Sequence, residues 1–194
     1  GLPEKSQLID RYLDFAMKAP ILHIKALGDR VFPVDFTFDY WLKNPIAGLS
    51  PTWEDLENHL SLLYPEVRIK GFLEIRTADA LPREWQLVPA FFYTGLLYCD
   101  AVLDKVLDLL TPFGQEINSL WDKGSFGFDS LEILDFSKKL MMLAKIGLSN
   151  LPEEFAGKEA LEKLQAFFEH YTAQRKTPAE ESIERFSFGK SLIY

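Results

Sequence analysis

The sequence predicts an α+β fold in which a mixed part of strands and helices precedes a helical part. First, residues 65–79 read PEVRIKGFLEIRTAD, where apolar and charged side chains alternate, as is typical of a β-strand with one buried face. Second, the sequence from residue 84 onward favours helices almost throughout. We therefore expect one α+β unit over residues 1–194, with residues 1–83 mixed and residues 84–194 helical.

The mixed part begins with a helix over residues 4–18, which Pro20 ends. Two short strands, ILHIKA and DRVFPVDF, are expected to form a hairpin around Gly28. A short helix in FTFDYWLKN and a longer one in SPTWEDLENHLSLLY follow, the latter with Ser50 or Thr52 as its N-cap. Pro65 closes that helix, and the alternating stretch predicts a strand over residues 67–77.

The helical part divides into six predicted helices, because apolar residues recur at helical spacing between Gly and Pro residues. Pro89 suits the first turn of a helix or a kink. The expected helices cover residues 89–98, 100–110, 113–122, 129–147, 153–173 and 178–186.

Composition and charge narrow the possible partners and the compartment. The net charge is −8, which argues against non-specific nucleic-acid binding, because a phosphate-binding surface is normally basic. The longest apolar run, residues 87–99, is too short and too interrupted to span a bilayer. One cysteine excludes an internal disulfide framework, and no secretory signal pattern is present. We therefore expect a cytoplasmic protein without nucleic-acid or membrane partners.

The alternating strand carries the best candidates for catalytic or binding residues. Its odd positions, Val67 to Ile75, are expected to be buried, and its even positions carry charges, namely Glu66, Arg68, Lys70, Glu74 and Arg76. Residues two apart on one face lie roughly 6.5–7 Å apart, so Glu74 and Arg76 could flank one ligand group. A carboxylate could hold a metal there, and a guanidinium could meet a phosphate or carboxylate. A solvated strand with cross-strand ion pairs is the competing interpretation, and the pattern alone favours it.

His59 lies on or near the apolar stripe of the predicted helix around residues 50–64. A single histidine in that position is more typical of a hydrogen-bonded core residue than of a metal ligand. We therefore expect His59 to be buried.

The sequence around the strand resembles that of a known family. The run WEDLENHLSLLYPEVRIKGFLEIRTADALP, followed by LVPAFFYTGLLY, is similar to the core signature of plant and proteobacterial glutamate–cysteine ligases. These enzymes carry W-x-x-H-L-T-T-x-F-P-E-V-R-L-K-x-Y-L-E-M-R-G-A-D and then A-L-P-A-F-W-V-G-L-L-Y-D. The stretches YLDFAMKAPI and KTPAE also resemble motifs of this family. The matching polar and special positions are His59, Pro65, Glu66, Arg68, Lys70, Glu74, Arg76, Asp79, Pro89, Gly95 and Tyr98.

This resemblance implies a function and a fold. The family joins the γ-carboxylate of glutamate to the amine of cysteine, using ATP and magnesium and passing through γ-glutamyl phosphate, in the first step of glutathione synthesis. Its fold resembles glutamine synthetase, so we expect part of a curved antiparallel sheet with the charged strand face on its concave side. By resemblance, Glu74 is a magnesium ligand and Arg76 a catalytic residue at the transferring phosphoryl group or a substrate carboxylate. Arg68, Lys70 and Asp79 are then expected to bind substrate.

Two departures from the family pattern keep other functions open. Thr77 stands where the family has glycine, and the basic stretch that follows is shortened to ALPRE. A carboxylate–amine ligase with a different acceptor amine, or a non-catalytic binding or assembly module of the same fold, therefore remains possible. We expect the chain to be the C-terminal portion of a longer ligase and to be inactive by itself.

Overall fold

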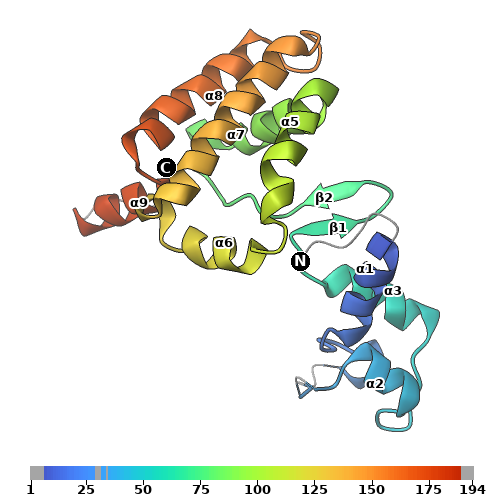
Figure 1. The fold of residues 1–194 in the computed structure, drawn as a ribbon. Helices are drawn as coiled ribbons and strands as arrows, with labels where there is room; N and C mark the ends of the chain where they lie inside the picture. Colours follow the sequence, from blue (N-terminus) through green and yellow to red (C-terminus); the bar gives the residue numbers. More distant parts are fainter. Residues whose placement is uncertain (1–6, 29–31, 34, 189–194) are drawn as a thin grey trace. The chain divides into compact units, whose positions relative to one another are not determined.

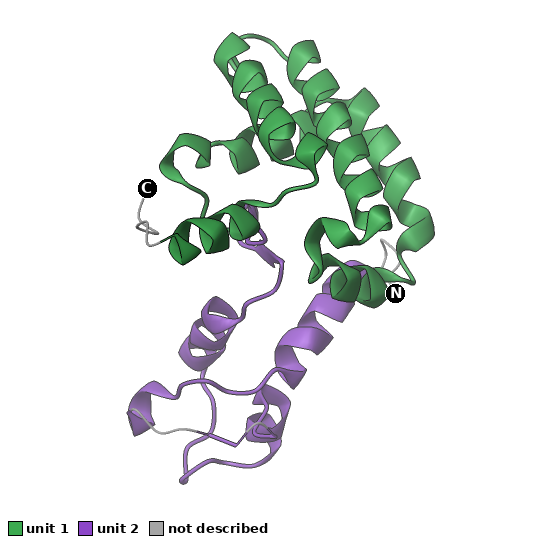
Figure 2. Cartoon of the chain, turned by 90° about the vertical axis from the view of Figure 1, so that its left-hand side faces the viewer, with its two compact units in different colours: residues 1, 78–194 green, residues 2–77 purple. Residues whose placement is uncertain are grey.

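The computed structural model describes residues 7–28, 32–33 and 35–188. The chain forms two compact units, residues 2–77 and residues 78–194 (Figure 2). The boundary between them therefore lies before the change in composition near residue 83. The expectation of a single α+β unit stays a prediction, because two compact parts do not by themselves define how they associate.

The unit of residues 2–77 contains three helices and a small antiparallel sheet among its described residues (Figure 1). The helices are α1 (Leu8–Lys18), α2 (Phe38–Lys43) and α3 (Trp53–Leu62). The sheet is a hairpin of β1 (Val67–Ile69) and β2 (Leu73–Ile75). All three helices were predicted, and the part of the first that covers residues 4–6 lies outside the described residues.

Two helices of this unit, α2 and α3, begin at a threonine N-cap. The Thr37 hydroxyl accepts a hydrogen bond from the backbone of Tyr40 and so caps α2. At α3, Thr52 and Asp55 form a reciprocal capping box, in which each side chain accepts a hydrogen bond from the other residue's backbone. Such a box satisfies two of the donors that a helix start leaves open. Thr52, and not Ser50, is therefore the N-cap of α3.

The expected hairpin around Gly28 is wrong in its first half. Lys25–Leu27 forms a single 3₁₀ turn, and Ile24 and Gly28 form an isolated bridge across it. Gly28 has a φ of 65°, a conformation that glycine adopts without strain, so the chain turns within a few residues instead of extending. Residues 29–31 and 34 of the second predicted strand lie outside the described residues.

The core of residues 2–77 confirms the expectation for His59. Four buried residues form this core, namely Ile21, Ile24, Phe38 and Trp41. His59 is 4% exposed, its ring centroid lies 5.0 Å from that of Phe38, and its Nε2 donates to the Ala16 carbonyl at 2.8 Å. This hydrogen bond ties α3 to the last turns of α1, so His59 is a structural residue.

Burial of His59 makes the stability of residues 2–77 depend on pH. Desolvation lowers the pKa of His59, against a smaller opposing effect of its bond to Ala16. The unfolded chain therefore binds a proton more readily, and the stabilising contribution present above the unfolded pKa of about 6.5 is lost as the pH falls. We expect the melting temperature to fall between pH 7.5 and pH 5.5 by more in wild type than in His59→Gln. Equal slopes in both proteins would contradict this prediction.

The predicted single strand over residues 67–77 is instead a tight hairpin. The register pairs Val67 with Ile75, Arg68 with Glu74 and Ile69 with Leu73. Lys70 donates its backbone N–H to the Phe72 carbonyl, which closes the turn around Gly71. Glycine has no side chain to obstruct so narrow a turn. The charged residues still share one face of the hairpin, because the turn pairs odd-numbered residues with odd-numbered ones and even-numbered with even-numbered ones.

The expectation that the apolar, odd-numbered residues of the hairpin are buried is also wrong within this unit. The apolar residues Val67, Ile69 and Leu73 are 43%, 44% and 69% exposed. The Arg68 side chain is only 12% exposed and that of Glu74 33%. The physical reason is that the charged side chains pair with each other and with the end of α3, which covers their face.

The unit of residues 78–194 is helical. A 3₁₀ turn over Arg83–Trp85 precedes α4 (Val88–Leu97) and α5 (Asp100–Leu110). Helices α6 (Ile117–Gly124), α7 (Leu131–Asn150), α8 (Lys158–His170) and α9 (Pro178–Ser187) follow. Every predicted helix is present, although α6 starts after a 3₁₀ turn at residues 111–113 and α8 is shorter than expected at both ends.

The core of this unit lies around α7, which packs against α4, α5 and α8 (Figure 1). Helices α4 and α7 cross at two glycines. A Cβ on Gly95 would stand 2.8 Å from the carbonyl carbon of Ala144, and one on Gly147 would stand 2.6 Å from that of Gly95. The backbones of the two helices are therefore in direct contact. The buried residues around this crossing are Trp85, Val88, Leu96, Val102, Val106, Met141, Ala144, Leu148, Ala160, Leu164 and Tyr171.

The described residues are mostly helical with a two-stranded antiparallel sheet, which agrees with the α+β class. The finer expectation of a glutamine-synthetase-like curved sheet stays a prediction, since this sheet has two strands of three residues. Within the described part of the chain, no single helix is long and apolar enough to cross a membrane. The pair 83–97 and 100–113 passes that test together but is bent by 93°.

Candidate functional site

The hairpin brings four of the sequence-predicted site residues together on one face. Arg68 and Glu74 stand directly opposite each other in the register, and Lys70 and Arg76 follow on the same face. Arg68 donates from Nε to Glu74 Oε2 at 2.7 Å, and its Nη2 lies 2.6 Å from the same oxygen. Lys70 Nζ lies 3.9 Å from that oxygen. The ion pair of the competing interpretation is therefore present.

Both arginines are held by the C-terminal end of α3. Arg68 Nη1 donates to the Ser61 carbonyl at 2.6 Å, and Arg76 Nη1 donates to the Leu63 carbonyl at 3.3 Å. The last carbonyls of a helix have no partner within the helix and carry the negative end of its dipole. The guanidinium carbon of Arg76 also lies 3.5 Å from the ring centroid of Tyr64. These contacts restrict two long side chains that would otherwise have many conformations.

The charge balance of this face is positive. The hydrogen bond from Arg68 lowers the pKa of Glu74, and the charges of Arg68, Lys70 and Arg76 lower it further. Glu74 is therefore ionised at neutral pH. Together with Glu66, which has the same parity, it sets two carboxylates against the three cations. Arg76 contacts a carbonyl oxygen and an aromatic ring, neither of which carries a negative charge that would neutralise it. A face with this excess of positive charge suits a phosphate or carboxylate group.

The same residues do not fit a magnesium ion by themselves. Magnesium takes oxygen ligands and keeps several waters, and it is held by one or two carboxylates together with substrate phosphates. Glu74 is one carboxylate among three cations, and its bond to Arg68 occupies Oε2. In the described ranges, no group of three His, Cys, Asp or Glu side chains could hold a metal. A metal site here requires ligands from elsewhere.

Asp79 belongs to the other unit, so the structure does not place it relative to the hairpin. It lines a cleft of about 1090 Å³ together with the turn at Phe126 and the start of α9 at Thr177 and Ile183. The structure thus brings together Arg68, Lys70, Glu74 and Arg76 in the hairpin, and it does not place Asp79 relative to them.

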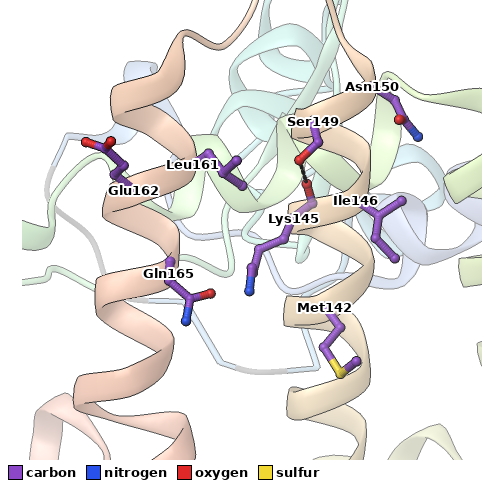
Figure 3. Close-up of a pocket in the computed structure, with 8 residues that line it drawn as sticks. All are labelled: Met142, Lys145, Ile146, Ser149, Asn150, Leu161, Glu162 and Gln165. Carbon is purple, nitrogen blue, oxygen red and sulfur yellow. Dashed lines mark hydrogen bonds between the residues drawn. The ribbon is translucent and has the colours of Figure 1, made fainter.

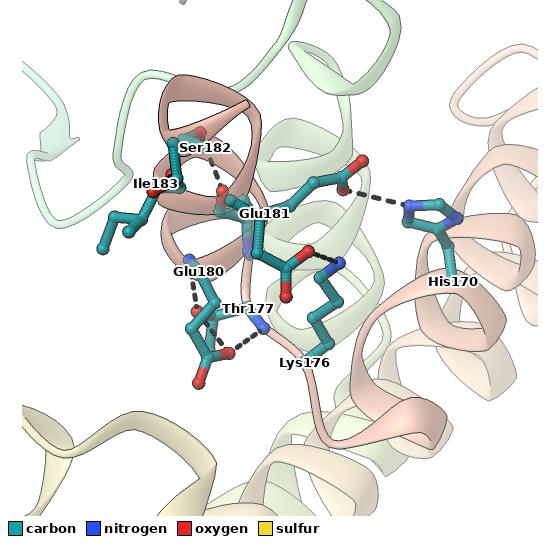
Figure 4. Close-up of polar contacts among 10 residues, drawn as sticks. His170, Lys176, Thr177, Glu180, Glu181, Ser182 and Ile183 are labelled. Carbon is teal, nitrogen blue, oxygen red and sulfur yellow. Dashed lines mark hydrogen bonds and ion pairs between the residues drawn. The ribbon is translucent and has the colours of Figure 1, made fainter. Parts of the chain in front are cut away.

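The start of α9 contains the KTPAE stretch, and its polar residues have structural partners (Figure 4). Thr177 and Glu180 form a capping box, and Lys176 Nζ lies 2.6 Å from Glu184. His170 of α8 lies 3.1 Å from Glu181, whose pKa is lowered by hydrogen bonds from Tyr171 and His170. The residues of this stretch therefore cap α9, and Glu181 connects the helix to α8.

A groove of about 570 Å³ lies between α7 and α8 (Figure 3). Lys145 and Gln165 extend toward each other across it, while Leu161 lies between the helices. The sequence-predicted site residues are not among those that line this groove. It is therefore separate from the predicted chemistry.

Tyr64 is a residue of the candidate site that the sequence analysis did not name. It is 77% exposed, yet its ring orients Arg76. An aromatic residue just before the helix-ending Pro65 was the available signal, since a residue before proline is extended and can turn its side chain toward a following strand.

A basic face on which two arginine side chains are held in place defines a candidate anion-binding protein. Residues 2–124, about two thirds of the chain, match glutamate–cysteine ligase family 2 (GCS2). The chain therefore belongs to this family, which confirms the resemblance found in the sequence.

Plant enzymes are among the relatives. The chloroplastic glutamate–cysteine ligase of Brassica juncea is 39% identical over 115 residues, which cover 56% of this chain and 22% of that protein. The enzyme of Medicago truncatula is 39% identical over 111 residues, or 55% of this chain and 22% of the relative. Glutamate–cysteine ligase A of Oryza sativa subsp. indica is 31% identical over 149 residues, or 72% and 30%. The matched segment is thus less than a third of each relative's length.

The expected cytoplasmic location is wrong in the light of these relatives. The enzymes of Brassica juncea, Medicago truncatula, Nicotiana tabacum and Arabidopsis thaliana are all named chloroplastic, which indicates a plastid. Composition could not reveal this, because net charge, apolar content and a single cysteine do not identify a particular compartment.

Proposed function

We propose that this chain forms part of an ATP- and magnesium-dependent ligase that joins the γ-carboxylate of glutamate to cysteine through γ-glutamyl phosphate. The hairpin face of Arg68, Lys70, Glu74 and Arg76 then binds the anionic groups of the reaction. The observation that carries the proposal is the fixed position of two arginine side chains on one basic strand face. Family membership supports the ligase chemistry, since the relatives are named glutamate–cysteine ligases.

Each residue has a distinct part in this proposal. Arg76, stacked on Tyr64, offers its planar fork to the transferring phosphoryl group or to a substrate carboxylate. Such preorganised donors stabilise negative charge that develops during the reaction without reorganising. Arg68 positions the Glu74 carboxylate, and Lys70 adds a positive charge at the edge of the face. In this proposal Asp79 also binds substrate, in the cleft beside α9.

Magnesium remains part of the proposal only as an ion held jointly with other segments. Bound magnesium would neutralise phosphate charge, and Glu74 would supply one oxygen ligand besides its bond to Arg68. The missing ligands must come from carboxylates outside the described hairpin.

A related ligase with a different acceptor amine is the second candidate. The observation in its favour is Thr77 at the family's glycine position together with the shortened ALPRE stretch. Thr77 follows Arg76 directly in the sequence, so a change there would alter the surroundings of Arg76.

The test is ADP release by the longest gene product that carries this segment, with ATP, magnesium and glutamate present. We expect turnover to require an amino-acid acceptor, with cysteine preferred in a panel of small amines. The 194-residue chain alone should release no ADP, because its described residues contain no group of three His, Cys, Asp or Glu side chains that could hold a metal. Glutamate-dependent ADP release from the short chain would contradict its proposed incompleteness. A long product that binds ATP but never turns over would favour the non-catalytic module.

A further inference from the structure

A second basic hollow lies in the unit of residues 78–194, away from the sequence-predicted residues. Three cations from three separate elements line it: Arg83 from the 3₁₀ turn, Lys163 from α8 and Arg185 from α9. Glu84 is the fourth residue of its lining, and its volume is about 570 Å³. Small-molecule sites commonly measure about 300–1,000 Å³, so the hollow is large enough for a small ligand.

Positive charges outnumber negative ones in the lining of this hollow, because Arg83, Lys163 and Arg185 stand against Glu84 alone. Across the described part of the chain, neither Arg83 nor Lys163 forms an ion pair with an acidic side chain. By contrast, Lys123 and Lys176 lie 2.5 and 2.6 Å from carboxylates. The whole protein has a net charge of −8, so a gathering of cations is not a consequence of composition. Glu84 can offset one of the three positive charges, and an anion in the hollow would interact favourably with the remaining excess.

One of the cations is also oriented by an aromatic ring. Lys163 Nζ lies 5.3 Å from the centroid of the Trp85 ring, within the range of a cation–π interaction. Trp85 is 8% exposed and belongs to the core of this unit. The ring therefore provides a rigid base under Lys163, while Arg83 is attached to the same short turn.

We infer that this hollow is a binding site for a small phosphate-bearing anion of the diphosphate type. Arginine meets phosphate oxygens with a planar pair of donors, and lysine adds a compact charge, so the set suits a compact group with several negative charges. The lining includes no aromatic residue on which a nucleobase could stack. Free pyrophosphate and the phosphates of a nucleoside diphosphate are thus expected to bind equally well. The site is separate from the proposed ligase chemistry and does not depend on it.

The test is calorimetric titration of the 194-residue chain with inorganic pyrophosphate, followed by Arg83→Gln, Lys163→Gln and the double variant. Each single change is expected to weaken binding roughly tenfold, as for loss of a charge-assisted contact. Lys105→Gln is the matched control, because Lys105 is an exposed lysine of α5 outside the hollow and its loss changes the net charge equally. It should bind like wild type. Circular dichroism must show that each variant is folded.

Trp85 offers a second readout, since an anion on Lys163 should change its fluorescence, and the change should be absent in Lys163→Gln. ADP should bind within about threefold of pyrophosphate and citrate at least tenfold more weakly. The inference is overturned if pyrophosphate does not bind at millimolar concentration, or if the double variant binds it like wild type. Citrate binding as tight as pyrophosphate, or ADP binding tenfold tighter, would overturn the phosphate assignment.

Discussion

Gly147→Ala is expected to destabilise the unit of residues 78–194 by about 3 kcal/mol, the upper end of the usual cost of overpacking. The new Cβ would stand 2.6 Å from the carbonyl carbon and 3.0 Å from the Cα of Gly95. These neighbours are backbone atoms of another helix, so no side-chain rotation can make room. The helices must separate, which would open the buried core around Ala144 and Leu148. The melting temperature should fall by roughly 10 °C.

The sign of this effect makes it diagnostic. In an ordinary helix interior, alanine in place of glycine stabilises by about 1 kcal/mol. Gly124 at the end of α6 is the matched control, because a Cβ there meets no atom within 4 Å. Gly124→Ala should leave the melting temperature unchanged or raise it, while Gly95→Ala should resemble Gly147→Ala. Thermal unfolding followed by circular dichroism measures all three. A stable Gly147→Ala protein would show that α4 and α7 do not touch through their backbones.

Arg76→Lys is expected to lower the turnover of the longest gene product roughly 100-fold, as for loss of one preorganised donor to a developing charge. Lysine keeps the positive charge but lacks the planar fork that stacks on Tyr64 at 3.5 Å and donates to the Leu63 carbonyl. The side chain would then lose both its orientation and its bidentate geometry. Because Arg76 lies at the end of a short hairpin and not in a core, the melting temperature should change little.

Tyr64→Phe is the control for this experiment, because it keeps the ring under Arg76 and removes only the hydroxyl. Its turnover should stay within about threefold of wild type, whereas Tyr64→Ala should lose activity, since Arg76 is no longer held. The kinetic constants separate the two roles of Arg76: a fall in kcat indicates the phosphoryl group, and a rise in KM for glutamate indicates a carboxylate. Near-normal kcat and KM in Arg76→Lys would remove Arg76 from the proposed site.

The local elements of this protein follow from short-range chemistry. The Thr52 capping box, the first-turn Pro178 of α9 and the spacing of apolar residues in α7 each depend on neighbours within a few positions. Such signals are written in the sequence itself. For the same reason, the alternation in residues 67–75 correctly placed Arg68 and Glu74 on one face.

The long-range features could not be read in this way. Whether residues 67–75 run on as one strand or fold back at Gly71 depends on the energy of a turn and of contacts with α3. Their burial was reversed because Ser61 and Leu63 offer carbonyl groups to the arginines, and no sequence pattern marks those carbonyls. The hollow at Arg83, Lys163 and Arg185 likewise joins residues that are about a hundred positions apart.

By itself, the sequence determined the helices, the shared face of the four charged hairpin residues, the buried state of His59 and membership of the glutamate–cysteine ligase family. These features depend on local helix propensity, on the alternation of side chains along a strand and on sequence motifs of fixed spacing. Only the tertiary structure decided the hairpin, the support of Arg76 by Tyr64 and the backbone contact of Gly95 with Gly147. Each of these arises where two segments meet in space, and their contact energies decide the outcome.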